Sequence, residues 1–186
     1  CIPAIPDHRG PPALRCIIPA MGLSGALVDG ALLSAAACLI IFSSLRANPR
    51  IWLNDFPADI RAAVPPKTAE ERRQSLVWGL PFMVILLGAP IASTLLAARA
   101  QTGSTFGQLW QHAFVVAFAF NLVDLLFVDW LILCTVRPRA FILPGTEGMA
   151  GYRNYRHHFR GFLIGTVFSA GLAAIAASVA RTLGSH

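Results

Sequence analysis

Three polar residues interrupt a long apolar segment of the chain. Asn121, Asp124 and Asp129 occur in the stretch NLVDLLFVDW. A carboxyl group deep in a membrane is costly, so it is normally protonated, paired or turned toward the interior of a helix bundle. At about 100° per residue of an α-helix, the three side chains share roughly one half of its circumference. Three interpretations follow: a proton or cation relay, a set of metal ligands, or hydrogen-bonding groups that lock helices together, with Asp129 paired to Arg137 or Arg139.

A second polar group follows in the stretch RPRAFILPGTEGMAGYRNYRHHFRGF. Glu147, His157 and His158 are expected at the same membrane interface as Asp129. Sets of histidines and carboxylates bind zinc or iron, or act as acids and bases on a lipid or a small phosphate ester. The competing interpretation places this segment on the inner membrane surface, where its arginines contact lipid headgroups. These arginines are Arg153, Arg156 and Arg160.

No cofactor is indicated by the motifs of the chain. The sequence contains no HExxH, GxSxG, GxGxxG, CxxC or P-loop motif. A haem held by two histidines of one chain is excluded, because His112 and the pair His157 and His158 are expected at opposite membrane faces. The spacing of the aspartates also differs from the aspartate motifs of membrane prenyltransferases and of CDP-alcohol phosphotransferases.

Four apolar segments are long enough to hold these residues inside a membrane. They cover residues 23–45, 76–98, 113–136 and 162–180, and a helix needs about 20 apolar residues to cross a bilayer. The chain of 186 residues is 55% hydrophobic and 13% charged, with a mean hydropathy of +0.61. A soluble domain carries roughly 25% charged residues. The sequence therefore predicts an all-α integral membrane protein, a bundle of four transmembrane helices with a partly helical cytoplasmic loop.

The distribution of basic residues predicts the orientation of the bundle. The segments 46–75 and 137–161 carry eleven of the 15 Lys and Arg residues. Because basic loops stay in the cytoplasm, we expect both of these loops inside and both termini outside. The net charge of +6 is then explained by loops that face anionic lipid. It does not require a nucleic-acid partner.

The first loop has local signals for helix ends. We expect Asp55 to cap a short helix that has Pro57 in its first turn and ends before Pro65. Thr68 and Glu71 form the pattern of a capping box, so the helix of the second span should begin about two turns before the lipid.

Small residues recur every four positions in the first and fourth spans, as Gly22, Ala26, Gly30, Ser34 and Cys38, and as Gly161, Gly165, Ser169, Ala173 and Ala177. Such stripes allow close helix packing in lipid. We expect spans one and four to be neighbours, or each to face a second copy in a homo-oligomer. Membrane lipids are the other expected partner.

Residues 1–20 contain five prolines and no continuous apolar run, and they do not match a signal peptide. Three interpretations remain open. The chain was processed, it is a fragment, or its natural start is Met21 and these residues are an upstream extension. The transmembrane domain then covers residues 21–186.

Several stretches resemble those of uncharacterised small multi-pass membrane proteins of bacteria. The stretches are NPRIWLNDFPADI, PPKTAEERRQS, NLVDLLFVDWLI and ILPGTEGMAGYRNYRHHFRGF, and the resemblance covers most of the chain after Met21. It implies a bacterial plasma membrane and nothing about chemistry. The dominance of Arg over Lys and the many Ala residues suit a GC-rich bacterial source.

The sequence favours an inner-membrane protein with a proton or cation site in its third span, in a transporter-like or accessory role. One alternative is a metal-dependent enzyme at the membrane interface, built on Asp129, Glu147, His157 and His158, that acts on a lipid or a small phosphate ester. Another alternative is a scaffold or assembly subunit of a membrane complex.

Overall fold

Four long helices make up most of the chain. The computed structural model describes residues 22–101 and 103–184, and no strand occurs in that part. Its long elements are α1 (Leu23–Ala47), α3 (Ala69–Ala100), α4 (Phe106–Val123) with its continuation η3 (Asp124–Val136), and α5 (Tyr155–Leu183). Each is long and apolar enough to cross a membrane, and they pack against one another. The predicted all-α fold with four spans is confirmed, whereas the predicted extension 1–20 lies outside the described residues.

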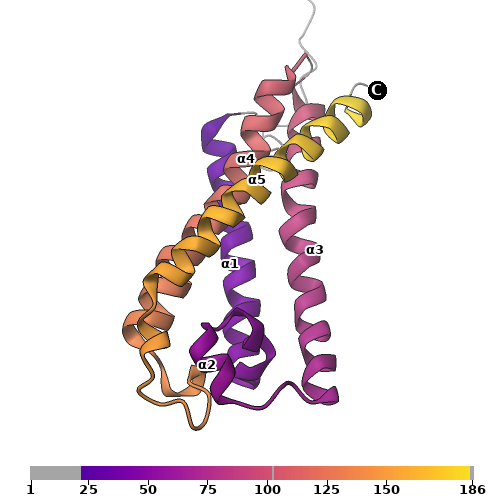
Figure 1. Ribbon diagram of the computed structural model, residues 1–186. Helices are drawn as coiled ribbons and strands as arrows, with labels where there is room; N and C mark the ends of the chain where they lie inside the picture. Colours follow the sequence, from indigo (N-terminus) through magenta and orange to yellow (C-terminus); the bar gives the residue numbers. More distant parts are fainter. Residues whose placement is uncertain (1–21, 102, 185–186) are drawn as a thin grey trace, which may run out of the picture.

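The bundle has two distinct ends (Figure 1). The connections between α1 and α3 and between η3 and α5 lie together at one end, which we call the loop end. The start of α1, the turn between α3 and α4, and the end of α5 lie at the opposite end. The helix α4 packs against α1, α3 and α5.

Large apolar side chains are exposed on all four helices. Leu39 is 70% exposed, Leu80 66%, Leu126 48% and Phe168 75%. Monomeric soluble proteins rarely expose apolar surface of this extent. The exposure is compatible with an integral membrane protein whose surface meets lipid.

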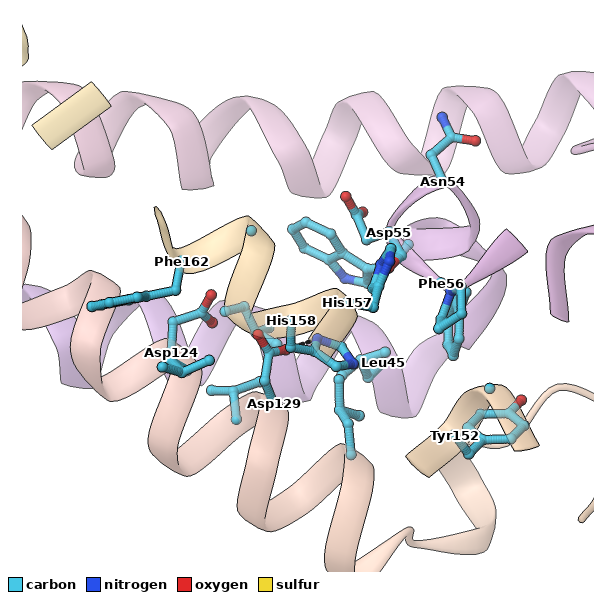
Figure 2. Close-up of a pocket in the computed structure, with 18 of the residues that line it drawn as sticks. Leu45, Asn54, Asp55, Phe56, Asp124, Asp129, Tyr152, His157, His158 and Phe162 are labelled. Atoms are coloured by element: carbon cyan, nitrogen blue, oxygen red, sulfur yellow. Dashed lines mark hydrogen bonds and ion pairs between the residues drawn. The ribbon is translucent and has the colours of Figure 1, made fainter. Parts of the chain in front are cut away.

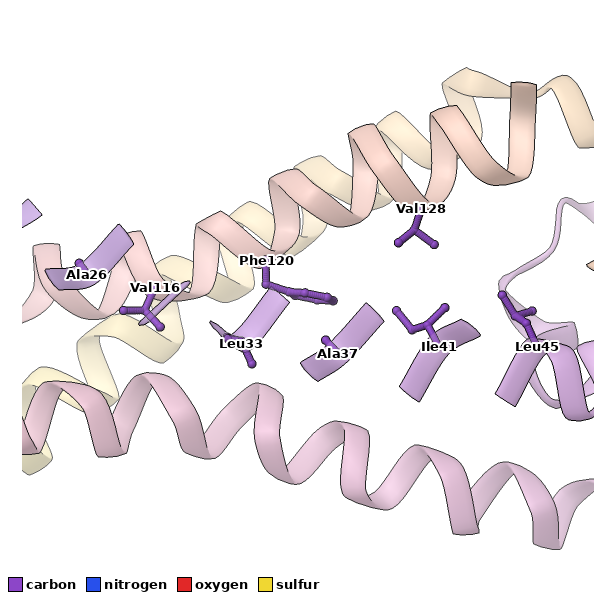
Figure 3. Close-up of a cluster of buried hydrophobic side chains, with 8 residues drawn as sticks. All are labelled: Ala26, Leu33, Ala37, Ile41, Leu45, Val116, Phe120 and Val128. Atoms are coloured by element: carbon purple, nitrogen blue, oxygen red, sulfur yellow. The ribbon is translucent and has the colours of Figure 1, made fainter. Parts of the chain in front are cut away.

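The interior contact between α1 and α4 is apolar. From α1, a line of residues seven or four apart points inward, and residues of α4 and η3 meet it (Figure 3). This core cluster consists of Ala26, Leu33, Ala37, Ile41, Leu45, Val116, Phe120 and Val128. It fills the middle of the bundle.

The small-residue stripes allow close packing between helices of the same chain. A methyl group on Gly30 would lie 2.6 Å from the Cβ of Ala119, and one on Gly165 would collide with the amide of Asn121. Both neighbours belong to α4, so α1 and α5 each pack closely on α4. The main helix contacts of both α1 and α5 are with α4 and α3 rather than with each other, so the prediction that spans one and four are neighbours is wrong. A homo-oligomer stays a prediction.

The first loop folds into short helices, η2 (Pro49–Asp55) and α2 (Ala58–Ala63). The predicted cap by Asp55 is wrong: Asp55 belongs to η2, and Pro57 occupies the N-cap position of α2 without any side-chain cap. The capping box of α3 is confirmed, since Glu71 N donates to Thr68 Oγ1 at 3.1 Å and Thr68 N to Glu71 Oε2 at 2.8 Å.

The two loops at the loop end share a small core of their own. Leu53, Phe56 and Ile60 of the first loop pack on Leu143 and Tyr152 of the second, near η4 (Arg139–Phe141) and η5 (Ala150–Arg153). Asp59 of α2 accepts a hydrogen bond of 2.9 Å from the backbone N–H of Gly151. The joined loops form a fixed cap over the ends of the helices.

Candidate functional site

A cavity of about 450 Å³ lies under this cap. Its walls come from α1, α3, α4, η3, α5 and the two loops (Figure 2). Its polar lining residues are Asn54, Asp55, Asn121, Asp124, Asp129, Tyr152, His157 and His158. Most of the residues that the sequence singled out are thus brought together.

The backbone of η3 explains why two aspartates share this cavity. From Asp124 to Val136 the chain forms a π-helix, and at its end Arg137 N donates to Ile132 O at 2.7 Å, five residues back. In an α-helix, residues five apart point about 140° away from each other. Bonding from i to i+5 winds the chain less per residue, which turns Asp124 and Asp129 toward the same side. Both line the cavity.

Asp129 is paired with a histidine of α5. His158 Nδ1 lies 2.9 Å from Asp129 Oδ1, and both side chains are largely buried. The expected partners Arg137 and Arg139 do not pair with Asp129. Arg137 ends the π-helix in a left-handed conformation with φ +51°. The sequence placed His158 at the same interface as Asp129, but it could not specify that the two side chains pair, because they meet through the packing of η3 on α5.

Asn121 and Asp124 have different surroundings. The Asn121 amide donates to Phe162 O and to Thr166 Oγ1, each at 3.1 Å, so it ties α4 to α5 as the structural interpretation expects. No residue in the described part of the chain hydrogen-bonds to the Asp124 carboxyl. Asp124 therefore offers an unpaired acidic group to the cavity.

The first loop contributes a carboxyl that the sequence pattern assigned to a helix cap. Asp55 lines the cavity, and its backbone carbonyl lies 3.1 Å from His157 Nε2. Water reaches Asp55, yet burial among protein atoms on the cavity side raises the pKa of its carboxyl, and nearby Lys67 opposes that shift. The only sequence signal for this role was a carboxylate in an ordered loop.

Glu147 and the arginines lie elsewhere. Glu147 is exposed and accepts a hydrogen bond of 3.2 Å from Gly145 N within its own turn, so it does not join Asp129, His157 and His158. The arginines predicted to contact lipid are exposed at the loop end and do not line the cavity. They are Arg153, Arg156 and Arg160. Within residues 22–101 and 103–184, no three His, Cys, Asp or Glu side chains form a group that could hold a metal ion.

The charge of the cavity lining is one-sided. Three carboxylates line it, Asp55, Asp124 and Asp129, but no Lys or Arg does. This contrasts with the eleven basic residues in the two loop segments at the same end of the bundle. None of these cations lines the cavity, whose titratable lining consists of acids, histidines and a tyrosine.

A separate polar cluster ties three helices together near the opposite end. Ser93 Oγ of α3 donates to Asp29 Oδ2 of α1 at 2.6 Å and lies 2.7 Å from His112 Nε2 of α4. Because the single hydroxyl hydrogen goes to Asp29, Nε2 of His112 must be the donor to Ser93. The sequence did not indicate this cluster, since its members lie in three different spans.

No protein-family model matches the chain, and neither a curated protein nor a solved structure is significantly similar to it.

Proposed function

We propose that this chain is a multi-pass protein of a bacterial inner membrane that binds cations or exchanges protons in the cavity at its loop end. The proposal includes both termini outside the cytoplasm, membership of the group of small bacterial membrane proteins that it resembles, and a transporter-like or accessory role. The observation that carries it is the acidic lining of a cavity without any Lys or Arg.

The balance of charges favours a positively charged occupant. His158 offsets the charge of Asp129 at 2.9 Å, whereas Asp124 has no such partner. A carboxyl group within a span needs a proton, a cation or a polar partner. Asp124 is therefore the group that we expect to release its proton when a cation enters, or to carry the proton itself.

The same balance argues against an enzyme for phosphate esters. Enzymes and binding proteins hold phosphate groups with Arg, Lys or a metal ion. The lining of this cavity has neither basic side chain, and Glu147, one member of the expected catalytic set, is turned into its own loop.

The test is proton movement in liposomes that contain the purified protein and a trapped pH-sensitive dye. An inward gradient of sodium or choline is imposed, and the dye reports protons that leave in exchange. We expect exchange with the wild-type chain and loss of at least about 90% of it with Asp124→Asn, which keeps the size of the side chain but removes its charge. Glu147→Gln is the matched control, because it removes an acid from the same end of the bundle outside the cavity.

Equal exchange by Asp124→Asn and wild type would overturn the proposal. If no chain moves protons, and the protein also takes up no sodium, choline or protons in detergent, the scaffold alternative replaces it. Circular dichroism and elution as a single species would establish that each variant is folded.

A further inference from the structure

Aromatic rings form much of the cavity wall, and they indicate what kind of cation fits. We propose that the occupant is a small organic ammonium compound, an inference that rests on the proposed cation site and makes it more specific. Trp52 and Phe56 come from the first loop, and Phe82 from α3. Tyr152 comes from the second loop and Phe162 from α5. Ammonium groups bind the faces of such rings, most strongly where water is excluded.

Four of these rings are held in place by one another and by Ser44, which lies outside the cavity. Trp52 Nε1 donates to Ser44 Oγ at 2.7 Å, and the Trp52 and Phe82 rings meet edge to face with centroids 5.5 Å apart. Phe56 and Tyr152 meet in the same way at 5.9 Å. An aromatic wall that is already fixed loses little conformational entropy when a ligand binds.

Acidic and aromatic side chains are interleaved along the cavity. In Figure 2, Phe162 lies beside Asp124 at the end of the cavity away from the loops, and Asp55 lies near Phe56 at the loop end. An organic cation has an apolar body and a positive head, and both kinds of surface are present within a short distance. A bare metal ion instead needs several oxygen or nitrogen ligands converging on one point, and no three His, Cys, Asp or Glu side chains in the described part of the chain form such a group.

The size of the cavity agrees with a small molecule. Its volume of about 450 Å³ lies within the range of roughly 300–1,000 Å³ in which proteins bind small organic ligands. A proton or a sodium ion would fill little of this volume, and it would not account for the aromatic side chains in the wall.

The experiment compares choline with the neutral alcohol in which a carbon atom replaces the nitrogen of choline. Binding is measured by calorimetry on the full chain in lipid nanodiscs. We expect choline to bind at least about tenfold more tightly than the alcohol, because only choline gains from the carboxylates and the ring faces.

Two variants on one helix test the aromatic wall. Phe162→Leu keeps an apolar side chain but removes a ring from the cavity, and we expect it to weaken choline binding about three- to tenfold. Phe168→Leu is the matched control, since Phe168 is 75% exposed and does not line the cavity. It should bind choline as the wild type does.

The outcomes distinguish the organic ammonium ligand from the more general cation site. If Asp124 proves necessary for proton exchange driven by sodium but choline binds no better than the alcohol, the organic cation is wrong and the cation site stands. If Phe162→Leu and Phe168→Leu bind choline equally, the aromatic wall has no role in binding. If the Asp124→Asn variant binds sodium and choline and exchanges protons as the wild type does, both proposals are wrong.

Discussion

Asp55 is the loop residue whose charge state should be coupled to folding. Burial raises the pKa of its carboxyl, Asp129 adds to the shift, and Lys67, His157 and Arg61 oppose it. A carboxyl with a raised folded-state pKa binds its proton more tightly in the folded protein than in the unfolded chain. Stability must therefore decrease as the pH rises from the ordinary range of Asp, near 4, through the raised pKa.

We predict that Asp55→Asn removes this part of the pH dependence. The variant should lose less stability than the wild type between about pH 4 and neutral pH, because it has no carboxyl to ionise. The measurement is the melting temperature in detergent at each pH, plotted as variant minus wild type so that all other titrating groups cancel. A difference that stays constant with pH would show that Asp55 is not coupled to folding.

At the scale of helices, the closest approach of α1 to α4 occurs at Gly30. We predict that Gly30→Ala destabilises the bundle by about 1–3 kcal/mol, because the new methyl group would lie 2.6 Å from the Ala119 Cβ and 3.2 Å from the carbonyl oxygen of Val116. Unfolding by a denaturing detergent, followed by circular dichroism, gives the free energy.

Gly88→Ala in α3 is the control for this prediction. Nothing lies within 4 Å of a methyl group at that position, and alanine favours a helix over glycine. We expect unchanged or slightly higher stability. If both variants were equally stable, the contact between α1 and α4 would be looser than described.

The helices themselves could be predicted because the constraints on them are local. Lipid requires about 20 apolar residues per span, and Thr68 with Glu71 marks the start of α3 within four residues of sequence. The register of η3 could not be predicted, because no comparable local sequence pattern marks its i to i+5 hydrogen bonds. The pairing of Asp129 with His158 depends on that register and on how η3 packs against α5.

For the molecule as a whole, the fold places both basic loops at one end and both described chain ends at the other. We predict that a cysteine replacing Glu147 is labelled by a membrane-impermeant maleimide only from the cytoplasmic side, and one replacing Ser104 only from the outside. Glu147 lies in a turn, and Ser104 lies in the connection between α3 and α4. The measurement uses intact cells and inverted vesicles, in a chain whose Cys1 and Cys16 are replaced by serine.

Labelling of the Glu147→Cys chain in intact cells would reverse the proposed orientation. Labelling of both chains from the same side would contradict the four-span topology itself. The orientation stays a prediction from the sequence, and it rests on a charge bias that acts on whole loops. The sequence could not predict the cavity, whose aromatic and acidic lining joins residues as distant as Trp52 and Tyr152 through the folded loops.

The apolar core between the two polar regions has a consequence for the proposed cation site. Along α4, His112 and Asp124 are 12 positions apart, about 18 Å at 1.5 Å per residue, and Val116 and Phe120 between them pack against Leu33 and Ala37 of α1. A cation bound at the proposed site near Asp124 would be separated from the cluster at His112 by this packed apolar layer. Passage to the other side would require the helices to rearrange once per cycle, which corresponds to the turnover of a carrier rather than the flux of an open channel.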